Sequence, residues 1–212
     1  TNHDKEKASS NTVTIEAKDK GDKVEVTLKD LNIDATSRGY KDPTDTGKAA
    51  VSVTGSGDTT IELDGSNTLK SGSKYAGLEH NKTDTSGKLT IQDDNDKAGS
   101  LDATGGLRGA GIGGGEAQNG QVTITGGDIT ATAGSTAGSY ETHGGGAGIG
   151  GGAGSRRGKI IGSGDVEITG GTITATGVYG AGIGGGRSAD GNVIISGGTI
   201  KKAESLSPTN PG

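Results

Sequence analysis

A seven-residue phrase, Gly-Ala-Gly-Ile-Gly-Gly-Gly, occurs three times without change, beginning at Gly109, Gly146 and Gly180. A second phrase alternates with it and begins at Val122, Val166 and Val193; its first copy reads Val-Thr-Ile-Thr-Gly-Gly-Asp-Ile-Thr-Ala-Thr. Two phrases that recur in turn indicate one structural unit stacked on copies of itself. The pattern therefore restricts the chain to a repeat architecture.

The low apolar content would suggest disorder if the apolar residues were placed at random. Only 27% of the 212 residues are hydrophobic, and Phe, Trp, Met and Cys are missing. The Val, Ile and Ala residues nevertheless stand in short period-two runs, which is typical of β-strands. A narrow solenoid needs little apolar material because its core is only a few side chains wide. We therefore predict an all-β, single-domain, right-handed parallel β-helix with three sides and about five to six coils.

Each coil should contain three short strands whose side chains point alternately inward and outward. In one coil we expect Thr123, Thr125, Thr130 and Thr132 to face outward, and the following residues to face inward: Val122, Ile124, Ile129, Ala131, Ala147 and Ile149. The first strands of successive coils are expected at Val24, Ile61, Leu89, Val122, Val166 and Val193. Segments 36–48, 133–145 and 153–165 are predicted insertions at corners, which tolerate them because they do not pair with neighbouring coils.

The glycine pairs at 126–127, 170–171 and 197–198 stand between the first and second strands of their coils. A corner of two residues requires a positive φ, which glycine adopts without strain. We expect residues 1–23 to form an N-terminal cap with an irregular strand over 13–17, residues 24–203 the β-helix, and residues 204–212 a C-terminal linker. Lys202 is predicted to occupy the core position of Ala131 and Ala175 and so to end the stack, and Pro208 and Pro211 would prevent further pairing.

The charge and composition exclude several functions. A net charge of −5 argues against nucleic-acid binding, which requires basic surfaces. No apolar run is long enough to span a membrane. With no Cys, and with His3, His80 and His143 far apart in sequence, no nucleophile–base pair is evident. We therefore expect a protein that is not an enzyme.

The segment 61–69, Ile-Glu-Leu-Asp-Gly-Ser-Asn-Thr-Leu, is followed by Tyr75-Ala-Gly-Leu78 and then by the glycine-rich phrases. Taken together over about residues 24–203, these features resemble secreted carbohydrate-binding-domain-like surface modules of Gram-positive bacteria. Such modules are right-handed parallel β-helices similar in fold to pectate lyases. The resemblance implies an extracellular, wall-attached module that contacts polysaccharide, and it assigns no functional residue.

The first candidate surface is formed by the glycine phrases. If Ala and Ile of each phrase point inward, Gly111, Gly148 and Gly182 point outward and form a strip of bare backbone on which a sugar chain or a protein could lie. The alternative is that glycine is needed because this side of the coil is cramped.

The second candidate surface is a corner with aromatic and cationic residues. Tyr75 and Tyr179 are expected at equivalent places before the third strand, so that they could form a stacking platform for sugar rings. Arginine forks suit carboxylates of acidic sugars. Packing across a corner and solvated corner charges remain the alternatives. The other residues assigned to this surface are Tyr140, His143, Arg108, Arg187, Arg156 and Arg157.

A third candidate is a cation site at Asp93, Asp94 and Asp96, since carboxylate oxygens are the ligands that Ca²⁺ prefers. The spacing matches neither the EF-hand loop nor the calcium-binding nonapeptide repeat, so a solvated turn is the alternative.

From these observations we expect a monomeric adhesion module, located at the bacterial cell surface, that binds a polysaccharide or a host glycan without catalysis. Two alternatives remain open from the sequence. One is a structural stalk or an adhesin that binds a host surface protein, and the other is a calcium-dependent polysaccharide lyase-like enzyme.

Overall fold

The computed structural model describes residues 4, 6–37, 47–95, 97–134, 145–156 and 159–206. These residues contain twenty β-strands and no helix, and hence no helix that could span a membrane. Most of the strands fall into three stacks, which we call face one, face two and face three.

Face one contains the first strand of each coil, and all neighbouring pairs within it are parallel. Its members in spatial order are β2 (Lys23–Lys29), the first part of β5 (Asp58–Lys70), β8 (Leu89–Gln92), β11 (Asn119–Ile124), β16 (Gly164–Ile168) and β19 (Gly191–Ile195).

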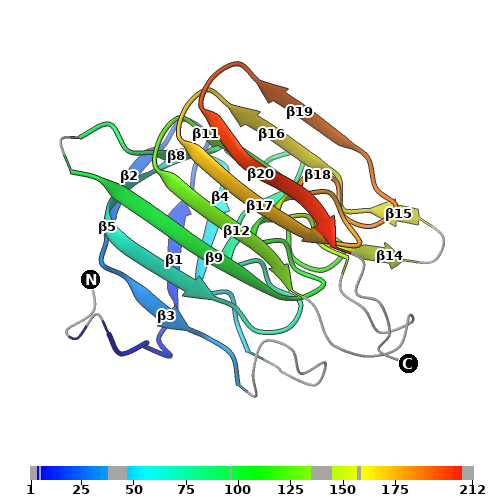
Figure 1. Ribbon diagram of the computed structural model, residues 1–212, viewed down its shortest axis with the longest axis horizontal. Coiled ribbons are helices and arrows are strands. Elements are labelled where there is room, and N and C mark those ends of the chain that lie inside the picture. Colours follow the sequence, from blue (N-terminus) through cyan, green and yellow to red (C-terminus); the bar gives the residue numbers. More distant parts are fainter. Residues whose placement is uncertain are drawn as a thin grey trace.

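Face two contains the second strand of each coil, and its strands lie side by side from blue to red in Figure 1. Because β5 runs on from face one, the two faces form one bent sheet. The members of face two are β3 (Asn32–Asp34), the second part of β5, β9 (Gly99–Leu107), β12 (Asp128–Gly134), β17 (Thr172–Val178) and β20 (Thr199–Leu206).

Face three is narrower, since four of its six strands have two residues. Its order is β1 (Val13–Ala17), β4 (Val51–Gly55), β6 (Leu78–Glu79), β10 (Ile112–Gly113), β13 (Ile149–Gly150) and β18 (Ile183–Gly184). The segment expected to be an irregular strand, β1, is a regular one that pairs in parallel with all five residues of β4.

Three short strands lie outside these stacks. β7 (Asn81–Lys82) pairs antiparallel with the start of β11. β14 (Gly154–Arg156) and β15 (Lys159–Ile161) form an antiparallel hairpin within the insertion predicted at 153–165. The backbone of Lys48 donates to the carbonyl of Ala35 at 3.2 Å, so the insertion at 36–48 leaves and returns at one corner.

The chain therefore winds repeatedly through faces one, two and three, and it is a parallel β-helix. The alternation predicted from the sequence is confirmed, because the six side chains expected inside the coil from Val122 to Ile149 are buried and the threonines between them are partly or fully exposed. Gly127, Gly171 and Gly198 have φ of 90°, 81° and 81°, as the tight corners require.

The register differs from the prediction in the second coil. Ile61 lies level with Val26 and Ile91, and not with Val24 and Leu89. Thr59 occupies the core position at the start of this strand, where its buried hydroxyl has no hydrogen-bond partner in the described part of the chain. A threonine in a core position carries no apolar signal, so the sequence placed this strand two residues too late.

The prediction for Lys202 was wrong. A bulge at Lys201 shifts the register between Ile173 and Thr174, so that Lys202 lies level with Thr174 on the outer surface. Ala203 takes the core position beside Ala175. The stack of described strands does end with β20, but a buried lysine is not the reason.

Asn67 is a buried polar residue that the sequence did not single out. It lies level with Leu101, in a row of the core that is otherwise aliphatic. Its Oδ1 accepts from the backbone of Leu31 at 3.0 Å, and its Nδ2 donates to the carbonyls of Asp64 and Ser100 at 3.1 Å. Asn67 thereby satisfies backbone groups of three coils at the corner between faces one and two.

Candidate binding site

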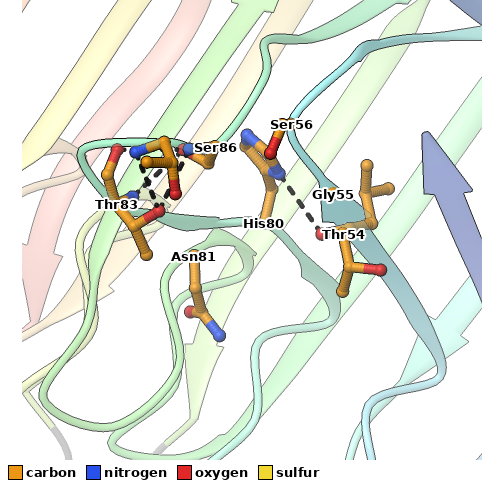
Figure 2. Close-up of a pocket in the computed structure, with 9 residues that line it drawn as sticks. Thr54, Gly55, Ser56, His80, Asn81, Thr83 and Ser86 are labelled. Atoms are coloured by element: carbon orange, nitrogen blue, oxygen red, sulfur yellow. Dashed lines mark hydrogen bonds between the residues drawn. The ribbon is translucent and has the colours of Figure 1, made fainter. Parts of the chain in front are cut away.

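A pocket of about 310 Å³ lies where face three turns into face one, between the end of β4 and the loop that follows β6 (Figure 2). We call it the hydroxyl pocket, because five of its nine lining residues are Ser or Thr. They are Thr54, Ser56, Thr83, Thr85 and Ser86, and the remaining walls come from Val53, Gly55, His80 and Asn81.

His80 forms the back of this pocket and ties its two sides together. Its Nδ1 lies 3.3 Å from the carbonyl oxygen of Val53 on β4, and its Nε2 lies 3.0 Å from that of Gly87 across the loop. Burial lowers the pKa of His80, although both carbonyls favour the charged form. A neutral imidazole has one N–H, so it donates to one of the two carbonyls at a time. With both nitrogens facing backbone, His80 positions the pocket and has no free nitrogen for a ligand.

The loop on the other side of the pocket is held by its own hydroxyl groups. The backbone N–H groups of Thr85 and Ser86 donate to Thr83 Oγ1 at 3.3 and 3.0 Å. Ser86 Oγ accepts from the backbone of Thr83 at 3.0 Å. These reciprocal bonds give the loop a defined shape without a ligand.

Three hydroxyl groups remain for a ligand. None of the hydrogen bonds among the described residues uses the side chains of Thr54, Ser56 or Thr85. No Asp, Glu, Lys or Arg side chain lines the pocket. The site thus offers uncharged donors and acceptors, which suit a neutral molecule that carries several hydroxyl groups.

A buried carboxyl group lies next to the pocket. Glu79 Oε2 accepts from the backbone of Ala76 at 3.1 Å, and its Oε1 accepts from Asn81 Nδ2 at 3.1 Å. Asn81 Oδ1 in turn accepts from the backbone of Gly115 at 2.9 Å. Burial raises the pKa of Glu79 to about 6, against the effect of these hydrogen bonds. The network fixes the Asn81 side chain in the pocket wall.

The glycine strip predicted on the outer surface does not exist. Gly111, Gly148 and Gly182 are buried, and a Cβ on each would meet the backbone of face two, at 2.5 Å from Thr132 N, 2.6 Å from Thr176 N and 2.5 Å from Glu204 N. Real Cβ atoms do not approach backbone so closely. The alternative interpretation, that glycine permits a cramped side, is therefore the correct one.

Tyr75 and Tyr179 are not equivalent. Leu78, Ile112, Ile149 and Ile183 lie level with one another on face three. Tyr75 lies three residues before Leu78, just as Gly109 and Gly180 lie three residues before Ile112 and Ile183. Tyr75 therefore stands in the position of these two glycines. Tyr179 instead shares its position with Lys74 and Arg108, and all three have positive φ, at 56°, 81° and 69°. The two tyrosines therefore do not form one platform in register.

Two of the four predicted arginines, Arg108 and Arg187, are already engaged. The Arg108 guanidinium forms an ion pair with Glu116, and the Arg187 guanidinium lies 5.8 Å from the centre of the Tyr179 ring. This contact is a cation–π interaction within one coil. Tyr140, His143, Arg157 and Asp96 lie outside the described residues, as does the side chain of Arg156.

Asp93 and Asp94 lie in the loop between β8 and β9, which folds over Glu62 and Asp64. Asp93 Oδ2 accepts from the backbone of Gly99 at 3.1 Å, and the backbone of Asp94 donates to Glu62 Oε1 at 3.2 Å. Glu62 Oε2 and Asp93 Oδ1 are buried without a partner in the described part of the chain. No group of three His, Asp or Glu side chains in that part could hold a metal ion. The calcium prediction also involves Asp96, which lies outside that part, so it stays a prediction.

Comparison with known proteins supports the fold. The family model described as Beta helix repeat matches residues 97–116 and 166–187. Two segments of this chain carry that repeat. Each matched segment contains a strand of face two and one copy of the glycine phrase. Comparisons with curated proteins and with solved structures found no significant match.

The hydroxyl pocket was missed by sequence reasoning. Its residues are common in surface loops, and none has a distinctive spacing. The one available signal was the stretch from His80 to Gly87, which interrupts the apolar pattern between Leu78 and Leu89 and so lengthens this corner.

Proposed function

We propose that this protein is a non-catalytic carbohydrate-binding module of a bacterial surface protein, and that it holds a neutral glycan in the hydroxyl pocket. The observation that carries the proposal is the set of three unengaged hydroxyl groups on a corner that His80 and Thr83 hold in shape. Specificity for sugars arises from a few correctly placed polar groups in a concave site. The surface location rests on the resemblance described above.

A neutral glycan is favoured over an acidic one by the charges around the site. The chain has a net charge of −5, and the pocket is lined by no lysine or arginine. Arg108, a candidate for binding the carboxylates of acidic sugars, is paired with Glu116. An acidic polysaccharide would therefore meet no free cation at this site.

The chemistry of the pocket supports a module without catalysis. Glycoside cleavage uses two carboxyl groups that flank the scissile bond. Two carboxyl groups adjoin lining residues in sequence, Glu79 before His80 and Asp84 between Thr83 and Thr85, and neither lines the pocket. Glu79 Oε2 accepts from the backbone of Ala76, and Glu79 Oε1 accepts from Asn81 Nδ2. We therefore assign Glu79 to the support of the pocket wall.

Binding can be measured by affinity electrophoresis and calorimetry with neutral polysaccharides, with polygalacturonate as the acidic comparison. We expect retention by a neutral polysaccharide and a dissociation constant that rises roughly fivefold to tenfold in Thr85→Val, since one hydrogen bond is worth about 1 kcal/mol. Thr130→Val, on the outer surface of face two, is the matched control. Equal binding by both variants, or retention by polygalacturonate alone, would contradict the proposal. Binding only to a protein would favour the adhesin alternative.

A further inference from the structure

The two ends of the β-helix are finished differently. At the N-terminal end Ser9 pairs with the open edge of β3, accepting from the backbone of Asp34 and donating to the carbonyl of Asn32, both at 2.9 Å. At that end Ile15 and Ile33 are buried, and Val13, Val24 and Val26 are partly buried. At the C-terminal end no described strand covers the last coil, and Val193, Ile195 and Leu206 are 38%, 49% and 45% exposed.

Within the described residues no strand pairs with the outer edge of β20, and the backbone groups of that edge lie at defined positions. The backbone of Tyr179 donates to the carbonyl of Leu206 at 2.9 Å, so the hydrogen-bonding groups of Leu206 face β17. Backbone groups alternate along a strand of a parallel ladder, and Lys202 and Glu204 therefore also face β17. The N–H and C=O groups of Ala203 and Ser205 point away from the helix, toward its open end.

We propose that the C-terminal end binds the same end of a second copy of this chain, through antiparallel pairing of the two β20 strands about Ala203. In this arrangement Ala203 exchanges both backbone hydrogen bonds with Ala203 of the other copy. Lys202 of each copy lies opposite Glu204 of the other. Opposite charges at directly facing positions stabilise a strand pair.

The charge pattern of β20 selects this register. Lys202 and Glu204 lie level with Thr174 and Thr176, so both side chains are on the outer surface. Within one chain their charged groups are 2.6 Å apart, and both side chains are partly exposed, which leaves them free to pair again across the interface. Pairing about Ser205 would instead place Leu206 opposite Glu204, so the register about Ala203 is the complementary one.

Head-to-tail association is disfavoured by the N-terminal end. The edge of β3 that would receive β20 is occupied by the segment containing Ser9. For β20 the pairing that remains is therefore the closed, symmetric one. From the sequence we expect a monomer, whereas the structure puts Lys202 on the surface, on the strand whose outer edge is unpaired within the described residues. Two joined copies would also present two hydroxyl pockets to one polysaccharide.

Sedimentation equilibrium over a wide range of protein concentration tests the pairing. We expect the wild-type chain to reach twice the monomer mass. Lys202→Glu and Glu204→Lys should each weaken the dimer roughly tenfold or more, because each places like charges at both facing positions. The combined exchange, K202E with E204K, should restore the wild-type dissociation constant.

Lys23→Glu makes the same charge change on an exposed lysine of β2, at the other end of the helix, and it should leave the dimer unchanged. Circular dichroism would verify that every variant is folded. A wild-type chain that stays monomeric at all concentrations would overturn the proposal. So would a combined exchange that dimerises no better than the single variants, or a Lys23→Glu variant weakened as much as Lys202→Glu, which would indicate head-to-tail contact.

Discussion

Single polar residues at the corners decide how stability depends on pH. Glu79 is buried, and its pKa is raised from 4.5 to about 6. Its contribution to folding is therefore complete below pH 4.5 and is lost as the pH rises through 6. His80, whose pKa is lowered by burial, acts in the opposite direction, because its contribution is lost as the pH falls below its unfolded value of 6.5.

Glu79→Gln isolates the first of these effects. Raising a pKa from 4.5 to about 6 corresponds to about 2 kcal/mol. Between pH 4 and pH 7 we expect the wild-type free energy of unfolding to fall by about that amount relative to the variant. Urea unfolding at a series of pH values measures the difference, and Glu16→Gln, on the exposed side of β1, is the control for loss of a carboxylate. A constant difference between variant and wild type would show that Glu79 does not titrate in this range.

At the scale of the strands, the glycine phrases determine how closely face three packs against face two. Gly148 is the clearest case, since a Cβ there would lie 2.6 Å from both Gly182 O and Thr176 N. Both of these atoms belong to backbone and cannot rotate away. We expect Gly148→Ala to cost about 3 kcal/mol or more, or to prevent folding.

Gly21→Ala provides the comparison for this substitution. Gly21 has a φ of +105°, but no atom lies within 4 Å of an added Cβ. Backbone strain alone should cost about 1–2 kcal/mol. Urea unfolding of both variants tests the argument, and equal losses of stability would mean that the packing of the two faces is not responsible.

The strands themselves were predictable wherever apolar residues alternate over four or more positions. This holds for the coil from Val122 to Ile149, where the inward side chains were assigned correctly. The glycine strip failed because the alternation rule applies to extended strands. In the glycine phrase the strand begins only at Ile112, so Gly111 lies outside it and does not alternate with its neighbours.

The errors in the candidate site have similar local causes. A bulge at Lys201 moved Lys202 to the surface, and an offset of one residue separated Tyr75 from the position of Tyr179. Neither the bulge nor the offset alters the spacing of apolar residues in the sequence, so neither could be predicted from that spacing. The hydroxyl pocket depends on which two loops meet beside His80, and this follows from the stacking of coils and not from spacing along the chain.

At the scale of the whole molecule, each coil is stabilised mainly by the coils on either side of it. β5 has partners on both sides in faces one and two, whereas β19 and β20 have partners on one side only within the described residues. The C-terminal end also exposes its core residues. Local opening should therefore be easiest there.

Hydrogen exchange can test this gradient and the proposed dimer together. At low protein concentration the backbone amides of β19 and β20 should exchange roughly a hundredfold faster than those of β5, β9 and β12, since terminal coils open without disrupting the rest. At high concentration the amides of Ala203 and Ser205 should gain the most protection, because they face the open end. Those of Lys202 and Glu204, already directed at β17, should change less. Uniform exchange along the chain would mean that the helix opens only as a whole, and the stacking of coils would then not act as a series of local contacts.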